Sequence, residues 1–133
     1  MSNKRNDVPA AEVDSTEFDE AMIAAQNSEA DFRIELSAPF TFEGETVTEL
    51  EFAFGKLTGA DSLAIEGELA ALNKATLVPE FSGEYLLRMA VRACTTKRAD
   101  GRRIGVDAFR AMPLADYIRI RGRARSFLLN AGL

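Results

Sequence analysis

The sequence predicts an α+β protein, in which a small N-terminal antiparallel β-hairpin sheet is followed by a C-terminal part of three to four helices. Apolar residues alternate with polar ones between Phe32 and Phe54, which is the pattern of half-buried strands. After Phe54 they recur at the spacing of helices. The chain has 133 residues, 47% of them apolar, which fits one globular domain. We therefore expect a single α+β domain at 32–133, preceded by a tail at 1–31.

The N-terminal segment is acidic. Residues 1–31 hold eight acidic residues against Lys4 and Arg5, and few large apolar side chains. Such a composition cannot bury enough apolar surface to offset the entropy lost on folding, so we predict a disordered acidic tail. Because Phe18 and Met22 are four residues apart, a short amphipathic helix around them is an alternative, and it would need a partner surface to hold it.

The predicted sheet covers residues 32–54. Two alternating stretches flank Glu43-Gly44-Glu45, where Gly44 can take the positive φ of a tight hairpin turn. One face of this hairpin is rich in phenylalanine. Because an isolated hairpin is at best marginally stable in water, we expect that face to pack on the helical part of the chain, and an uncovered part of it could form a groove for a partner.

Four helical segments are predicted after the sheet, at 59–74, 83–95, 107–112 and 113–130. Thr58 and Asp61 have the spacing of a helix cap, and Ser82 can cap the second helix. The second helix is apolar almost all round, so we expect it at the centre of the domain. The polar run between this helix and Asp107 is predicted to be a basic loop.

The last helix carries an apolar arc that is wider than one core face needs. Six of its residues are expected to face the core: Tyr117, Ile120, Ala124, Phe127, Leu128 and Ala131. Leu114, Ile118 and Leu129 widen the arc to about 200°, and Arg121 and Arg125 lie inside it. Either both arginines extend over Leu114 and Ile118 or pair with acids of the sheet, or they separate a core face from a partner-binding face. On the second interpretation, the partner-binding residues are Leu114, Ile118, Arg121, Arg125 and Leu129.

The residues that most enzymes use are missing. The chain has no histidine and one cysteine, Cys94, which excludes a Ser-His-Asp triad, a Cys-His pair, Cys/His zinc sites and an internal disulfide. No glycine-rich phosphate loop or nucleophile elbow is present. Composition leaves carboxylate catalysis and carboxylate metal sites possible, but paired carboxylates such as Glu43 and Glu45 stand at i, i+2 and are expected to form a solvated charge row. We therefore predict no catalytic residues, no cofactor and no metal, and we do not expect an enzyme.

Charge is distributed unevenly along the chain. Residues 1–80 carry 5 basic and 17 acidic residues, or −12, whereas residues 81–133 carry 11 and 4, or +7. The basic half can neutralise the acidic half of its own chain, or it can attract nucleic acid. A small nucleic-acid-binding regulatory protein is therefore the alternative function. No apolar run approaches the ~20 residues of a membrane span, and the N-terminus does not have the pattern of a secretion signal, so neither a membrane partner nor export is expected.

Four strings and the order of the elements resemble a known family. The strings are Leu36–Gly44, Leu57–Asp61, Glu80–Leu87 and Met112–Tyr117. They are similar to those of the tail assembly chaperones of contractile-tailed phages and prophages of the Mu-like and P2-like group, over about residues 32–129.

The resemblance implies a non-enzymatic protein of the host bacterial cytoplasm that is absent from the mature virion. Such chaperones keep the long tape-measure protein soluble and help to recruit tail-tube subunits. The expected partners are therefore the tail tape-measure protein and the tail-tube protein, with self-association as a further hypothesis. Nucleic acid is not the expected partner.

Overall fold

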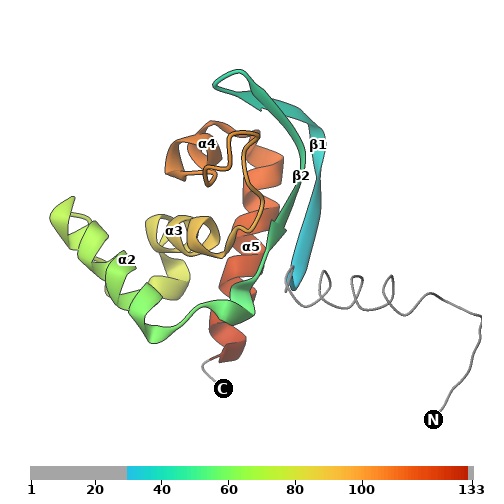
Figure 1. Ribbon diagram of the computed structural model, residues 1–133. Helices are drawn as coiled ribbons and strands as arrows, with labels where there is room; N and C mark the ends of the chain where they lie inside the picture. Colours follow the sequence, from blue (N-terminus) through green and yellow to red (C-terminus); the bar gives the residue numbers. More distant parts are fainter. Residues whose placement is uncertain (1–29, 132–133) are drawn as a thin grey trace, which may run out of the picture.

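The computed structural model describes residues 30–131 (Figure 1). It confirms the predicted α+β class. Residues 1–29 of the predicted tail, which include its alternative amphipathic helix, lie outside the described residues. The elements are β1 (Phe32–Phe42), β2 (Glu45–Phe52), the short 3-10 helix η1 (Phe54–Lys56), α2 (Gly59–Ala71), the 3-10 helix η2 (Pro79–Phe81), α3 (Gly83–Ala93), α4 (Val106–Ala111) and α5 (Leu114–Ala131).

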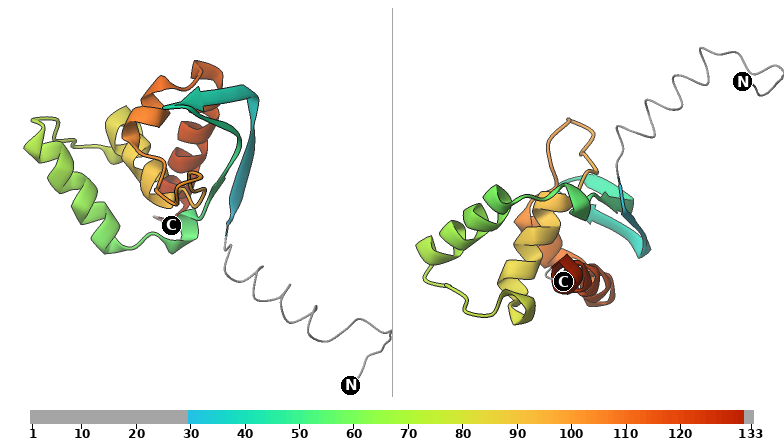
Figure 2. Two further views of the ribbon diagram at one scale, coloured as in Figure 1. Left: turned by 45° about the horizontal axis from the view of Figure 1, so that its top comes forward. Right: turned by 90° about the horizontal axis from the view of Figure 1, so that it is seen from below.

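The helix α3 is central, as the sequence predicts. It packs against α2 on one side and against α5 on the other, and Figure 2 shows it between these two helices. Ser82 caps α3, since its Oγ accepts the N–H of Tyr85 at 3.1 Å. The β1–β2 hairpin curves over α5 and α4 and closes the core from the opposite side to α2 (Figure 1).

The hairpin turn forms where the sequence predicts it. Glu43 and Gly44 both have positive φ angles, 51° and 82°, which is the signature of the two-residue turn that matches strand twist. The second strand, however, ends at Phe52 and not at Phe54 as expected. Phe54 lies in η1, where its ring stacks on that of Phe52 with centroids 5.5 Å apart, so its burial was predicted correctly and its backbone was not.

A large bulge interrupts the sheet. Glu35 pairs with Glu49 and Phe40 pairs with Val47, so four residues of β1 lie opposite one residue of β2. Extra residues on one strand bend a hairpin and increase its twist. The bulge therefore lets the base of the hairpin pack on α5 while its tip reaches α4.

Buried Asp116 holds this bulge in place. Its Oδ1 accepts the backbone N–H of Ser37 at 3.0 Å, and its Oδ2 accepts the Ser37 hydroxyl at 2.9 Å. The side chain is fully buried, and Arg119 one turn later lies 3.5 Å from Oδ1. A carboxylate buried with this many donors is well satisfied, so it can fix the distance between β1 and α5.

Arg88 is also buried, which the sequence did not predict. Arg88 shares one polar edge of α3 with Glu84 and Arg92, and that edge faces α2. Arg88 forms ion pairs with Glu84 and with Glu68 of α2. Arg92 contacts Asp61 at 2.8 Å, so acids from the first half of the chain neutralise bases from the second half here.

Several helix boundaries differ from the predictions. The helices α2 and α3 end before Leu72 and Cys94, not at 74 and 95. Gly105 precedes α4, and Asp107 lies in its first turn and does not cap it. Ala131, expected in the core, is exposed.

The folded domain also begins earlier in the chain than predicted. Asp31 was assigned to the tail, yet its N–H donates to Phe52 O at 2.8 Å and its carboxylate accepts the N–H groups of Phe54 and Gly55. The folded domain therefore includes Asp31.

Candidate partner-binding surface

The helix α5 presents two adjacent faces. Asp116, Ile120 and Ala124 are buried against the hairpin and α3. At about 100° per residue, a second row lies within an arc of about 80° beside this core face. That row, which we call the α5 stripe, consists of Leu114, Ile118, Arg121, Arg125 and Leu129. The five predicted partner-binding residues thus share one face of one helix.

The apolar members of the α5 stripe are open to solvent. Leu114 is 69% exposed, Ile118 44% and Leu129 45%. Single exposed leucines are ordinary on protein surfaces, but a row of them along one helix face is typical of a contact site. The expected widening of the apolar arc beyond the core face is confirmed.

Phe81 extends the stripe, and the sequence did not single it out. It belongs to η2, which packs on α5, and it is 72% exposed. It directly precedes the helix cap Ser82, where an apolar residue commonly packs against the first turn of the helix. Because its ring lies outside any periodic pattern, no periodicity could have assigned it to this surface.

Both stripe arginines lie over aromatic rings. The guanidinium carbon of Arg125 is 4.8 Å from the centroid of the Phe81 ring, and that of Arg121 is 5.7 Å from the centroid of Tyr117. These are cation–π distances. Neither arginine forms an ion pair with a residue in the described part of the chain.

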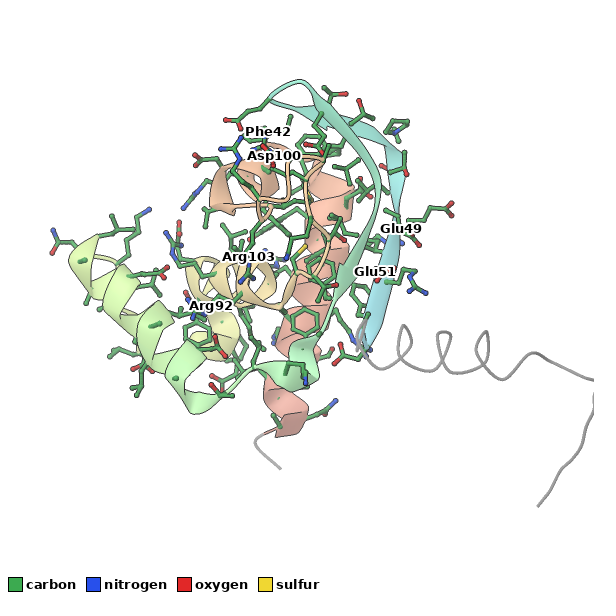
Figure 3. All side chains as sticks on the ribbon, viewed as in Figure 1. Phe42, Glu49, Glu51, Arg92, Asp100 and Arg103 are labelled. Atoms are coloured by element: carbon green, nitrogen blue, oxygen red, sulfur yellow. The ribbon has the colours of Figure 1, made fainter. Side chains whose placement is uncertain are left out.

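The suggestion that these arginines pair with acids of the sheet is therefore wrong. Glu49 and Glu51 contact Arg33 instead, at 3.5 and 2.8 Å. Figure 3 shows both glutamates on the side of the hairpin that faces away from the helices. The other half of that interpretation has the arginines extend over Leu114 and Ile118, whereas in the structure Arg121 lies over Tyr117 and Arg125 over Phe81.

A shallow hollow borders the α5 stripe at Leu114 and Tyr117. It lies between α3, α4 and α5 and has a volume of about 570 Å³. Glu84 at its edge contacts Arg88, Arg110 and Lys74. The hydrogen bond from Arg88, with those from Lys74 and Arg110, lowers the pKa of Glu84 to about 2, so this edge stays charged at neutral pH.

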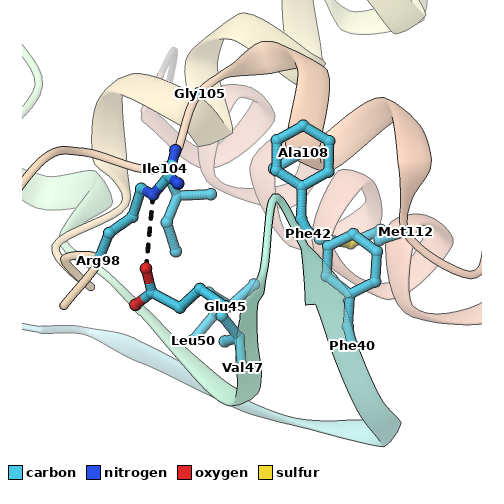
Figure 4. Close-up of a pocket in the computed structure, with 10 residues that line it drawn as sticks. All are labelled: Phe40, Phe42, Glu45, Val47, Leu50, Arg98, Ile104, Gly105, Ala108 and Met112. Carbon is cyan, nitrogen blue, oxygen red and sulfur yellow. Dashed lines mark ion pairs between the residues drawn. The ribbon is translucent and has the colours of Figure 1, made fainter. Parts of the chain in front are cut away.

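The phenylalanine-rich face of the hairpin does not form the second groove that the sequence suggested. Phe40 and Phe42 are half-buried and pack toward Ala108 and Met112 (Figure 4). The remaining apolar cleft has a volume of about 30 Å³, which is room for one or two water molecules. The Arg98–Glu45 ion pair lies at one side of it, so this cleft is the junction of the hairpin tip with α4.

The three arginines of the basic loop all contact other groups of the same chain. Arg98 contacts Glu43 of the hairpin turn at 2.8 Å, and Arg102 contacts Asp100 at 2.8 Å. Arg103 donates to the carbonyl oxygens of Val91 and Arg92. The loop therefore does not present a continuous row of phosphate-binding groups.

The rest of the described chain offers few groups that could bind a metal ion or react. Within residues 30–131, no group of three or more Asp, Glu, Cys or His side chains is placed to hold a metal ion. Cys94 is buried, and that burial raises the pKa of its thiol, as expected for a core residue. None of the helices that the structure describes is long and apolar enough to cross a membrane.

Comparisons with protein families, with curated proteins and with solved structures find no match to this chain.

Proposed function

We propose that this chain is a tail assembly chaperone that binds the tape-measure protein through the α5 stripe and Phe81. The observation that carries the proposal is the row of exposed apolar residues on a helix whose adjacent face is buried in the core. A chaperone for a long helical protein needs such a surface, because it must cover apolar stripes reversibly.

The four strings that resemble the chaperone family support the choice of partner. Two of them contain residues of this surface, since Glu80–Leu87 contains Phe81 and Met112–Tyr117 contains Leu114. The tail-tube protein is proposed as the second partner. The protein acts in the host bacterial cytoplasm, without catalysis, and leaves before the virion is complete.

The positive charges of the α5 stripe are better suited to capturing a partner protein than to stabilising the fold. Arg121 and Arg125 hold positive charge beside apolar side chains, and such rim charges govern encounter and register. A tape-measure helix that carries carboxylates beside its apolar stripe would complement them. The internal pairing of the basic loop argues against the nucleic-acid regulator as the main function.

Co-expression tests the proposal. The tape-measure protein of the same genome is produced with and without this chain, and its soluble fraction is compared. We expect a marked gain in soluble tape-measure protein and a co-purifying complex. No gain in solubility, together with tight and salt-sensitive binding to random duplex DNA, would support the regulator instead.

A further inference from the structure

A second hollow, on a different side of the molecule, is basic. It lies between η1, the end of α3 and the loop that follows α3, and has a volume of about 490 Å³. Four cationic side chains and one carboxylate line it: Lys56, Arg92, Lys97, Arg103 and Asp61. We call it the basic hollow. Figure 3 shows Arg92 and Arg103 close together over α3.

Two cations of the basic hollow, Arg92 and Arg103, are held in place by the fold. Arg103 donates to the last carbonyl oxygens of α3, which keeps its guanidinium over the helix end. Arg92 is oriented by Asp61 at 2.8 Å. Arg92 also lies 3.7 Å from Glu68, whereas Lys97 and Arg103 form no ion pair within the described residues, so the basic hollow keeps positive charge and suits an anionic occupant.

The chain enters the domain at the rim of this hollow. Asp31 is fixed because its Oδ1 accepts Phe54 N–H at 3.0 Å and its Oδ2 accepts Gly55 N–H at 2.7 Å. The next two residues, Lys56 and Leu57, line the hollow itself. The point at which residues 1–29 join the domain therefore lies beside the hollow.

The attached segment has the complementary charge. Residues 1–29 contain seven acidic residues and two basic ones. Glu17, Asp19 and Glu20 are within 14 positions of Asp31. An extended chain of that length reaches up to ~45 Å, so these carboxylates are well within range.

An apolar hollow adjoins the basic one and shares Leu57 and Asp61 with it. It has a volume of about 160 Å³ and is lined mainly by side chains of α2, α3 and α5, among them Ile65, Met89 and Phe127. The acidic part of the N-terminal segment also contains Phe18, Met22 and Ile23. The two adjoining hollows thus match both kinds of side chain in that segment.

We propose that the acidic N-terminal segment, residues 12–29, binds in the basic hollow of its own chain and occludes it. The occupant is the chain itself, so the outcome does not depend on which partner the α5 stripe binds. The segment neutralises a cationic surface that would otherwise attract polyanions such as nucleic acid.

Paramagnetic broadening in the full chain tests this directly. A nitroxide label is attached to Ser15→Cys, while Cys94 stays unmodified because it is buried and burial raises its pKa. The unmutated chain serves as the labelling control. We expect loss of the amide signals of Ala93, Lys97 and Arg103 at low salt. The signals should return at about 1 M salt, where the Debye length is ~3 Å.

The matched control carries the same label but has its neighbouring carboxylates neutralised, with Glu12, Glu17 and Glu20 changed to Gln and Asp14 and Asp19 changed to Asn. It should show no loss at the basic hollow. Absence of broadening in the acidic chain, equal broadening in the control, or broadening at Ile118 and Arg125 would overturn the proposal. So would broadening between labelled and unlabelled molecules in a mixed sample, since the occupant would then be a second copy.

Discussion

Ser37 of β1 and Asp116 of α5 are joined by two hydrogen bonds, although 79 residues separate them in the chain. Both donors of Ser37, its backbone N–H and its hydroxyl, are accepted by one fully buried carboxylate. The contact fixes the bulge of β1 against the first turn of α5. It therefore also sets which face of α5 is buried and which face is left for a partner.

Replacing Asp116 should destabilise the domain strongly. Asp116→Ala removes two part-buried hydrogen bonds from Ser37 to a carboxylate, and hydrogen bonds to a charged group contribute about 1.5–3 kcal/mol each. Urea unfolding followed by circular dichroism measures the loss. Asp107→Ala is the matched control, because Asp107 is exposed in the first turn of α4, and it should change the free energy of unfolding by no more than about 0.5 kcal/mol. Equal losses in the two variants would show that the Ser37 contact adds nothing.

The ion pairs of Glu84 should make stability depend on acid. The pKa of Glu84 is lowered from 4.5 to about 2 in the folded state, chiefly by the hydrogen bond from Arg88. A carboxyl with a lowered folded pKa stabilises the protein above its unfolded pKa, and this contribution is lost as the pH falls toward the folded value. Unfolding of the native chain should therefore become easier between pH 4.5 and about 2, and Glu84→Gln should flatten that part of the profile. A profile unchanged by Glu84→Gln would contradict this assignment.

Two glycines should respond to alanine in opposite directions. Gly44 has a φ of 82° in the hairpin turn, where a Cβ is strained, so Gly44→Ala should cost roughly 1 kcal/mol. Gly67 lies inside α2 with open space around its Cα, so Gly67→Ala should raise stability by about 0.5–1 kcal/mol. Thermal melts show whether each substitution lowers or raises the melting temperature. A higher melting temperature for Gly44→Ala would mean that the turn takes another conformation.

Reversing the charge of the stripe arginines should affect capture more than folding. Arg121 and Arg125 stack on Tyr117 and Phe81 and have no ion pair within the described residues, so Arg121→Glu with Arg125→Glu removes only modest interactions. We expect a melting temperature close to that of the native chain and weaker binding of the tape-measure protein, with a changed salt dependence. A large fall in melting temperature with unaltered pull-down would remove both residues from the binding site.

Local signals in the sequence predicted the order and type of the main strands and helices correctly, although several of their boundaries differ. The change of period near Phe54, the turn at Gly44 and the cap at Ser82 each depend on residues a few positions apart, and all three are observed. The central position of α3 also follows from its own composition. These features account for the element order and for the α5 stripe.

Features that depend on distant residues were missed. The Ser37–Asp116 contact and the burial of Arg88 against α2 require knowledge of which elements pack together, and no spacing within a helix or strand encodes it. The bulge of β1 was not predicted for the same reason. The alternation of apolar and polar residues predicts a strand but not its register with the neighbouring strand. Phe81 joined the candidate surface only through the packing of η2 on α5.

The central claim is that the α5 stripe binds the tape-measure protein, and a paired substitution tests it most directly. Leu114→Ser with Ile118→Ser removes two apolar side chains of the stripe, which are 69% and 44% exposed. Leu63→Ser with Leu72→Ser is the matched control on the α2 side of the molecule, at 70% and 52% exposure. All four sites are exposed, so both variants should keep a melting temperature close to that of the native chain.

The measurement is the amount of tape-measure protein that stays soluble and co-purifies with each variant on co-expression. We predict that the Leu114/Ile118 variant loses most of this amount while the Leu63/Leu72 variant keeps it. Full capture by the Leu114/Ile118 variant, or an equal loss in both variants, would contradict the assignment of the partner site to α5.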